Sequence, residues 1–181
     1  MRQPATVETA FGHQARALLL QLDAACKAAE QLNEATDQAF VDHPDAAILT
    51  SFPGLGGLTA ARVLAEIGDD RTRFADARAL RAYAGSAPVT RTSGKSHIVM
   101  HRRVKTQRLA ATGYLWTFAA LTKSDAVRAH YDRRRHSGDR HAAALRNLFN
   151  RFLSQLHHCL ANGQPYTEHK AFPPQGAPAA A

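Results

Sequence analysis

The sequence predicts a mainly α-helical protein, and three kinds of observation support this prediction. Ala, Leu and Arg dominate the 181 residues while β-branched residues are sparse, a composition that favours helices. Apolar residues recur at helical spacing over the first 40 residues. Further along, glycines, prolines and capping side chains bound shorter helical stretches. A chain of this length forms one domain with an appendage, or two small domains, and can bury a core without a disulfide or a metal.

Residues 5–40 are predicted to form one long helix. Its apolar residues are spaced alternately by four and three, which is the a/d pattern of a coiled coil. These residues are Phe11, Ala15, Leu18, Leu22, Ala25, Ala29 and Leu32. The pattern fits a weak coiled coil that joins copies of the chain, one arm of a helical hairpin, or an amphipathic helix packed on the domain. His43 precedes Pro44 and ends the helix, so residues 1–43 are expected to form a coiled-coil-like linker helix.

The next segment predicts two helices joined by a glycine turn, the arrangement of a helix-hairpin-helix. The first helix covers 45–51, with Asp45 as its N-cap. Residues 53–57, Pro-Gly-Leu-Gly-Gly, form the turn. The second helix starts at Thr59 and stops at Gly68, a residue type that commonly ends helices.

The rest of this domain, which is expected to span residues 44–163, is also mainly helical. Asp76 can cap a helix that Gly85 ends. Alternating polar and apolar residues predict a short β-hairpin near 91–104. Three further helices are predicted, at 108–121, 124–135 and 140–161. The tail over 164–181 is rich in proline and alanine and is expected to be disordered.

The positive charge of the chain is concentrated in one segment. Residues 91–151 contain 14 Lys and Arg and three acidic residues, a net charge of +11, whereas the other 120 residues have a net charge of −3. Such a segment favours a nucleic-acid partner over a solvated basic surface without one. No apolar stretch is long enough to span a membrane and no signal pattern is found, so a cytoplasmic protein without a membrane partner is expected.

The turn between the first two helices of the domain is a candidate phosphate-binding site. In a helix-hairpin-helix, a Gly-hydrophobic-Gly turn points backbone N–H groups outward at the start of the second helix, where the helix dipole favours an anion. Gly54, Leu55 and Gly56 have this form. Such a contact positions the nucleic-acid backbone without reading bases. The alternative is a plain helical hairpin that packs against a neighbour.

A second candidate site is the polar loop Thr92-Ser93-Gly94-Lys95-Ser96. A serine hydroxyl attacks phosphorus only when its proton is removed and the phosphate charge is neutralised. The residues expected to supply positive charge are Arg91, Lys95, Arg102 and Arg103. The loop is not a Walker A motif, because Val89 stands where the first glycine would lie. Taken alone, these residues favour a turn that contacts phosphate over a catalytic serine.

The remaining polar and aromatic residues are given simpler roles. Three adjacent arginines are expected to face phosphate: Arg133, Arg134 and Arg135. The histidines lack the spacing of metal ligands, so no metal is expected in this chain. Core packing is favoured for three aromatic residues: Tyr114, Trp116 and Phe118. Buried reduced thiols are expected at Cys26 and Cys159.

An ordered series of motifs resembles the C-terminal domain of bacterial insertion-sequence transposases of the IS110, IS116 and IS902 type. The series comprises Ser51-Phe52-Pro53-Gly54-Leu55-Gly56, Ala65-Glu66-Ile67-Gly68-Asp69, Arg73-Phe74, Leu80-Arg81-Ala82-Tyr83-Ala84-Gly85, Ala87-Pro88 and Thr92-Ser93-Gly94-Lys95. Two later runs, 114–121 and 131–135, also look like that family. The resemblance covers residues 45–160.

The resemblance implies a DNA recombinase that excises and inserts its element, with a structured non-coding guide RNA bridging donor and target DNA. It implies that Ser93 forms a covalent link with DNA. It also implies an N-terminal RuvC-like domain with four metal-binding acids, where the divalent metal is expected. The sequence before residue 45 contains no such set, so we expect the chain to lack that half and to need it for strand cleavage.

Two other interpretations remain open. One is a non-enzymatic helix-hairpin-helix module that binds nucleic acid and is retained from a decayed element. The other is a helical interaction protein that dimerises through residues 5–40. A steep loss of DNA binding with salt would support the transposase domain and the nucleic-acid-binding module, and it would separate both from the interaction protein.

Overall fold

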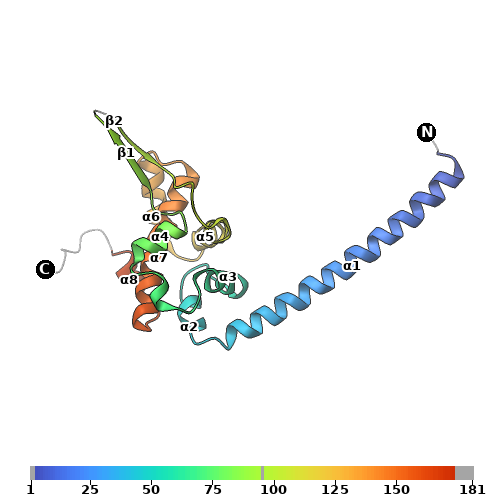
Figure 1. Ribbon diagram of the computed structural model, residues 1–181, viewed down its shortest axis with the longest axis horizontal. Coiled ribbons are helices and arrows are strands. Elements are labelled where there is room, and N and C mark those ends of the chain that lie inside the picture. The colour runs from blue at the N-terminus through green and yellow to red at the C-terminus, as the bar shows by residue number, and fades with distance from the viewer. Residues whose placement is uncertain (1–2, 95, 174–181) are drawn as a thin grey trace. The chain divides into compact units, whose positions relative to one another are not determined.

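The computed structural model describes residues 3–94 and 96–173. This part of the chain is mainly helical, with eight α-helices, one short 3-10 helix and one two-stranded sheet (Figure 1), which confirms the predicted fold class. The chain divides into two compact units, residues 1–39 and 40–181. No helix among the described residues combines the length and the apolar character that a membrane span requires.

The first unit consists of most of helix α1, which runs from Ala5 to Val41 and matches the predicted long helix. Its large a/d side chains, Phe11, Leu18, Leu22 and Leu32, are 57–69% exposed. Cys26 is also exposed, so the expectation of a buried thiol is wrong there. The physical reason is that a single helix has no second layer to cover its apolar face.

The second unit begins with helix α2 (Ala46–Thr50), a glycine turn and helix α3 (Gly57–Ile67). Helix α3 ends at Gly68, as predicted. Asp45 does precede α2, but it makes no side-chain cap hydrogen bond, which corrects the predicted capping role. Its backbone is already helical and its carboxylate is instead paired with the Arg71 guanidinium.

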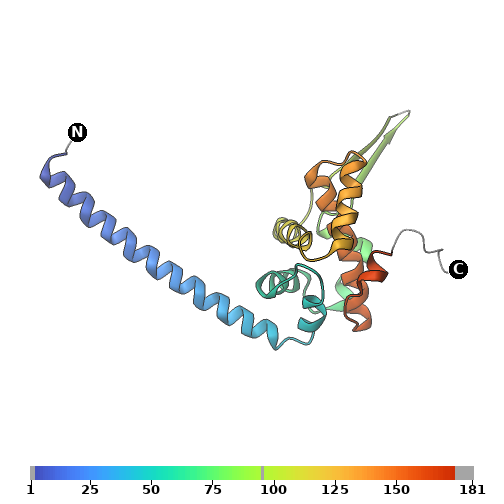
Figure 2. The same cartoon turned by 180° about the vertical axis from the view of Figure 1, so that it is seen from behind.

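The middle of the unit contains the 3-10 helix η1 (Arg71–Arg73), helix α4 (Ala77–Tyr83) and a β-hairpin. Asp76 caps α4 as predicted, because its Oδ1 accepts a hydrogen bond of 2.7 Å from the Ala79 N–H. Strands β1 (Val89–Ser93) and β2 (Ser96–Met100) pair antiparallel. The predicted hairpin therefore exists, but it begins two residues earlier and ends four residues sooner. Figures 1 and 2 show it extending away from the helices of the same unit.

The last four helices are α5 (Gln107–Ala120), α6 (Asp125–His136), α7 (His141–Asn162) and α8 (Glu168–Ala171). The first three agree with their predicted spans to within one residue. Helix α7 carries nine buried residues and packs against α4, α5 and α6. It is therefore the central helix of the domain.

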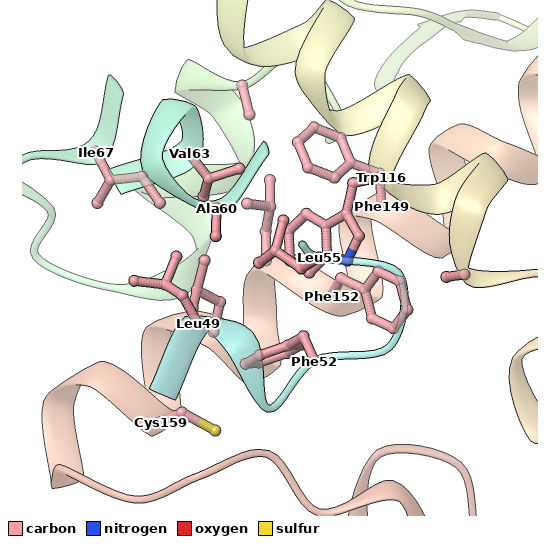
Figure 3. Close-up of a cluster of buried hydrophobic side chains, with 14 of the residues drawn as sticks. Leu49, Phe52, Leu55, Ala60, Val63, Ile67, Trp116, Phe149, Phe152 and Cys159 are labelled. Carbon is pink, nitrogen blue, oxygen red and sulfur yellow. The ribbon is translucent and has the colours of Figure 1, made fainter. Parts of the chain in front are cut away.

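The core of this unit is built around Trp116 and Phe152, which are both fully buried (Figure 3). Their rings are stacked with centroids 4.9 Å apart. Phe52, from the segment after α2, meets the Trp116 ring edge-on at 5.5 Å. The indole N–H of Trp116 donates a hydrogen bond of 3.1 Å to the Pro53 carbonyl. The glycine turn is thus held to the core by both packing and a hydrogen bond.

Part of the expected disordered tail belongs to the domain. Ala171 and Phe172 are buried, and the Tyr166 N–H donates a hydrogen bond of 2.8 Å to Ser51 Oγ. Arg151 lies over the Phe172 ring at 4.8 Å. The prediction of disorder is therefore wrong for 164–173, because its aromatic residues find apolar partners that composition does not reveal. Residues 174–181 lie outside the described part of the chain.

Candidate nucleic-acid interface

The three residues predicted to contact phosphate, Gly54, Leu55 and Gly56, differ in their exposure and in their contacts within the glycine turn. Gly54 has a φ of +74°, and a Cβ added there would lie 2.4 Å from the Ala120 backbone nitrogen. Leu55 is buried and its N–H bonds the Phe52 carbonyl at 3.3 Å. These two residues fix the turn against α5. Gly56 is exposed at the N-cap.

The start of helix α3 is the part of this turn that faces outward. Its N-cap residue, Gly56, offers no side-chain oxygen to the first N–H groups of the helix. Those N–H groups have no intrahelical acceptor and are available to an anion, with the positive end of the helix dipole behind them. Of the three predicted contacts, only Gly56 is thus exposed next to N–H groups that lack an intrahelical acceptor.

Ser93 is the last residue of β1 and is exposed at the outer end of the hairpin. Gly94 follows it with a φ of +53°, a left-handed conformation that glycine adopts without strain. Arg91 lies on the same face as Ser93, because side chains two residues apart in a strand point the same way. Lys95, also predicted here, lies outside the described residues.

Three of the predicted arginines meet at the base of the hairpin. Arg91, Arg102 and Arg103 line an open hollow of about 280 Å³ together with His101. The other lining residues are apolar, namely Val89, Met100 and Val104, and none of the seven is acidic. Arg102 Nε is buried and finds no hydrogen-bond partner among the described residues. The hollow therefore carries an excess of positive charge.

The three arginines at the end of α6 do not form one surface. Arg134 is paired with Asp139, with 2.6 Å between Nη2 and Oδ2, and Arg135 donates a hydrogen bond of 2.6 Å to the Asp139 carbonyl. Both side chains thereby hold the turn between α6 and α7. Arg133 is exposed, and its guanidinium forms no hydrogen bond or ion pair with another described residue. Adjacent helical residues differ by about 100° in direction, so one face cannot hold all three.

An aromatic group at the surface was not foreseen from the sequence. Trp116 is buried as predicted, but Tyr114 and Phe118 are 43% and 54% exposed, so the core prediction is wrong for those two. Both rings contact the ring of His141 edge-on. Their spacing of four residues, with Trp116 midway, places them on the face of α5 opposite to the tryptophan. In the sequence, that spacing is the feature that indicates a face for Tyr114 and Phe118 different from that of Trp116.

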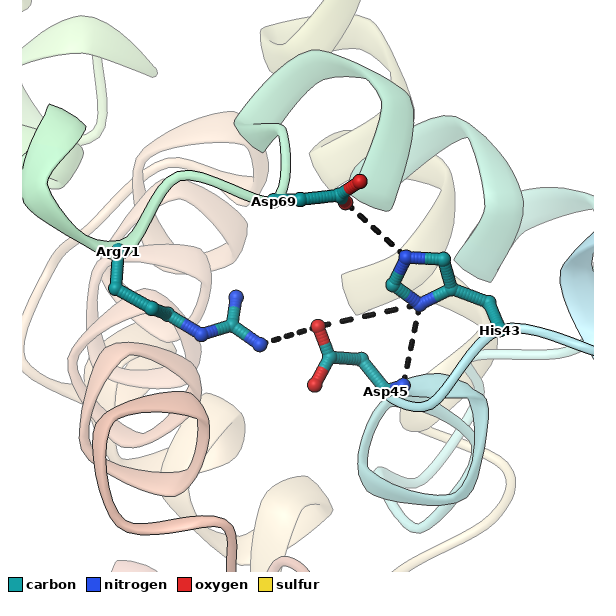
Figure 4. Close-up of polar contacts among 4 residues, drawn as sticks. All are labelled: His43, Asp45, Asp69 and Arg71. Atoms are coloured by element: carbon teal, nitrogen blue, oxygen red, sulfur yellow. Dashed lines mark hydrogen bonds and ion pairs between the residues drawn. The ribbon is translucent and has the colours of Figure 1, made fainter.

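His43 joins the end of α1 to the loop after α3 (Figure 4). Its Nδ1 accepts a hydrogen bond of 3.1 Å from the Asp45 N–H, and its Nε2 lies 3.1 Å from Asp69 Oδ1. The Arg71 guanidinium pairs with the Asp45 carboxylate in the same group. Both ring nitrogens of His43 are therefore engaged, and the network ties the segment before α2 to the loop after α3.

Comparison with known proteins places the chain among transposases. The sequence model of the family described as "Transposase IS116/IS110/IS902 family" matches residues 46–136, from α2 to the end of α6. The "Mini-circle putative transposase for IS117" of Streptomyces coelicolor is 61% identical over 173 residues, which are 96% of this chain and 42% of that protein.

Two further relatives are more distant. The "Insertion element IS110 uncharacterized 43.6 kDa protein" of Streptomyces coelicolor is 36% identical over 159 residues, 87% of this chain and 36% of that protein. The "Insertion element IS900 uncharacterized 42 kDa protein" of Mycobacterium paratuberculosis is 36% identical over 121 residues, 66% of this chain and 30% of that protein. The chain thus spans less than half the length of these relatives.

Proposed function

Because this chain belongs to the IS116/IS110/IS902 family of transposases, we propose that it is the DNA-binding C-terminal part of an insertion-sequence transposase, acting in DNA recombination. The observation that carries the proposal is the hollow lined by Arg91, Arg102 and Arg103 at the base of the hairpin that bears Ser93. Guanidinium groups suit phosphate because they neutralise its charge and match its oxygens in pairs.

The DNA backbone is proposed to contact two places in this unit. One is the arginine-lined hollow, and the other is the start of α3 at Gly56, where N–H groups lack an acceptor side chain. Arg133 is a further candidate because it is exposed, whereas Arg134 and Arg135 are already engaged by Asp139. These contacts hold the backbone and position it for reaction without reading sequence.

Ser93 is assigned as the nucleophile that links the protein to DNA. The Ser93 hydroxyl loses its proton, its Oγ bonds to phosphorus, and the P–O bond to one neighbouring deoxyribose breaks. The departing oxygen takes up a proton, so that one phosphodiester replaces another. Arg91, on the same face of β1, is suited to neutralise the phosphate oxygens during this exchange.

Other parts of the reaction are assigned to partners. Among the described residues, no three His, Cys, Asp or Glu side chains are grouped to hold a metal ion. We assign the divalent metal to a nuclease-like domain such as the resemblance implies, supplied in trans or by a longer protein. A guide RNA is proposed to bridge donor and target DNA. Helix α1 is proposed to join copies of the chain.

DNA binding is tested by measuring affinity for a duplex against salt concentration. We expect a steep loss of affinity with salt, and Arg102→Gln should make the slope of log affinity against log salt shallower by about one. The matched control is Arg128→Gln, whose guanidinium is exposed on α6 and paired with Asp132; its slope should equal that of the parent. A parent protein without binding at low salt would overturn the proposal.

The role of Ser93 is tested with element-end DNA, guide RNA and the nuclease-like domain supplied in trans. A covalent protein–DNA adduct is expected on denaturing gels and should disappear in Ser93→Ala. Thr92→Ala is the control, because Thr92 is the exposed neighbouring hydroxyl on the opposite face of β1. An adduct that survives Ser93→Ala contradicts the assignment.

A second candidate function is non-enzymatic nucleic-acid binding. It is favoured by one observation: among the residues whose side chains the structure describes, none forms a hydrogen bond with Ser93 Oγ through which it could take up the hydroxyl proton. Salt-dependent binding by the parent, without an adduct under any of these conditions, would support this second function.

A further inference from the structure

We propose that helix α1 pairs antiparallel with α1 of a second copy of this chain, in the register that sets residue 11 opposite residue 36. This inference rests on the proposed joining of copies through α1 and adds the direction and register of the pairing. Three features of α1 carry it: the exposure of its apolar face, the alternation of large and small residues along that face, and the distribution of its charges.

The first feature is an apolar face that the described part of the first unit leaves uncovered. Phe11, Leu18, Leu22 and Leu32 are more than half exposed and lie on one stripe of the helix. Between residues 11 and 36, every residue in the a, d, e and g positions is uncharged. The charged side chains of this stretch lie only at the b and f positions, on the outside of a helix pair that would meet along the a and d positions, here called the seam. They are Arg16, Asp23, Lys27, Glu30 and Glu34.

The second feature is the order of large and small residues along the stripe. In the antiparallel register each core layer sets one large side chain against one small one, and the layers are Phe11/Thr36, Ala15/Leu32, Leu18/Ala29 and Leu22/Ala25, each occurring twice by symmetry. A parallel, in-register pair instead stacks like on like, and layers of paired alanines leave gaps. Antiparallel registers shifted by one heptad also oppose alanine to alanine and leucine to leucine.

The residues beside the seam favour the same direction. Leu19 and Cys26 occupy e positions, and Leu19 is 65% exposed in the single helix. In an antiparallel pair e positions flank e positions, so that Leu19 of one copy covers Cys26 of the other. In a parallel pair e flanks g, which would set these two residues against Gln14 and Gln21.

The third feature is the distribution of charge along α1. The second half of the helix, residues 23–41, has a net charge of −3, whereas residues 5–22 carry one acid and one arginine. Parallel pairing places the two acidic halves side by side. Antiparallel pairing separates them and sets each acidic half beside the neutral half of the other copy, which lowers the electrostatic repulsion. It also opposes the two helix dipoles.

The proposal is tested by cross-linking single cysteines in the full chain. In a Cys26→Ala background, Gln21→Cys and Ala28→Cys place thiols at g positions that face each other only in the proposed register. A mixture of the two variants should form a cross-linked dimer with a short bis-maleimide, and each variant alone should form little. Cys159 is buried, so it does not interfere. The matched control is Ala17→Cys, at an outward c position.

Three outcomes overturn the proposal in distinguishable ways. Parallel pairing sets residue 21 beside residue 26, so strong self-cross-linking of Gln21→Cys with Cys26 retained would show the opposite direction. A dimer by sedimentation without the 21–28 link would show another register or surface. A monomer would mean that α1 pairs with a helix outside this chain. DNA affinity, measured separately, reports on the proposed function and not on the direction of α1.

Discussion

At the scale of single residues, the structure separates those that hold the fold from those that remain available to a ligand. Leu55, Arg134 and Arg135 were candidates for phosphate contact, and their polar groups are engaged within the domain. Gly56 and Arg91 are exposed, whereas Arg102 is partly exposed and its buried Nε has no hydrogen-bond partner among the described residues. Residue type alone does not separate the two groups, because an arginine serves equally well in an internal ion pair and in a phosphate contact.

The hydroxyl of Tyr166 gives a prediction at this scale. It is buried without a hydrogen-bond partner in the part of the chain that the structure describes, and burial raises the pKa of this phenol above its usual range. An unpaired buried hydroxyl costs its hydration, so Tyr166→Phe should stabilise the domain by about 1 kcal/mol in urea unfolding. Tyr131→Phe is the comparison, since its hydroxyl lies 2.6 Å from His141 Nδ1, and it should destabilise by about the same amount. Equal effects of the two changes would contradict this account.

At the scale of elements, the turn between α2 and α3 is a part of the candidate interface that contacts with the core hold in place. The Pro53 carbonyl accepts the Trp116 N–H, and Gly54 packs against the backbone at the end of α5. These contacts hold the turn against α5 and position the start of α3. A fixed set of N–H donors binds an anion without first losing conformational freedom.

Two glycine substitutions in this turn should behave oppositely. Gly54→Ala adds a Cβ that meets the α5 backbone at a positive φ, and should lower the free energy of unfolding by about 2 kcal/mol or more. Gly56→Ser adds an N-cap oxygen in open space and should leave stability unchanged or slightly higher.

The same two variants test the proposed phosphate contact. The serine oxygen of Gly56→Ser would occupy the N–H groups that DNA is proposed to use, so DNA affinity should fall several-fold while the fold is retained. Thermal unfolding and DNA titration of the same preparations check both effects. Unchanged affinity in Gly56→Ser would remove the start of α3 from the interface.

At the scale of the whole molecule, the chain combines a single helix that has no hydrophobic core of its own with a domain that has one. The buried residues from Phe40 to Phe172 form a single cluster in the second unit. The first unit exposes its apolar stripe. Stability and self-association are therefore expected to reside in different units.

Removing residues 1–39 tests this separation. The remaining chain should keep the thermal unfolding transition of the domain, because none of its core residues is lost. It should be monomeric by sedimentation where the full chain is dimeric. A domain that fails to fold without α1 would contradict the division, whereas a truncated chain that still dimerises would place the association surface in the second unit.

The sequence by itself determined the helical class, the bounds of α1 and of α5 to α7, and the cap at Asp76. These features depend on periodicity and on contacts a few residues apart, which a sequence contains directly. Only the tertiary structure decided that Tyr114 and Phe118 are exposed, that residues 164–173 pack on the domain, and that Arg91, Arg102 and Arg103 share one hollow. Each of these depends on which distant segments become neighbours, and helix packing fixes that choice only when the whole core forms.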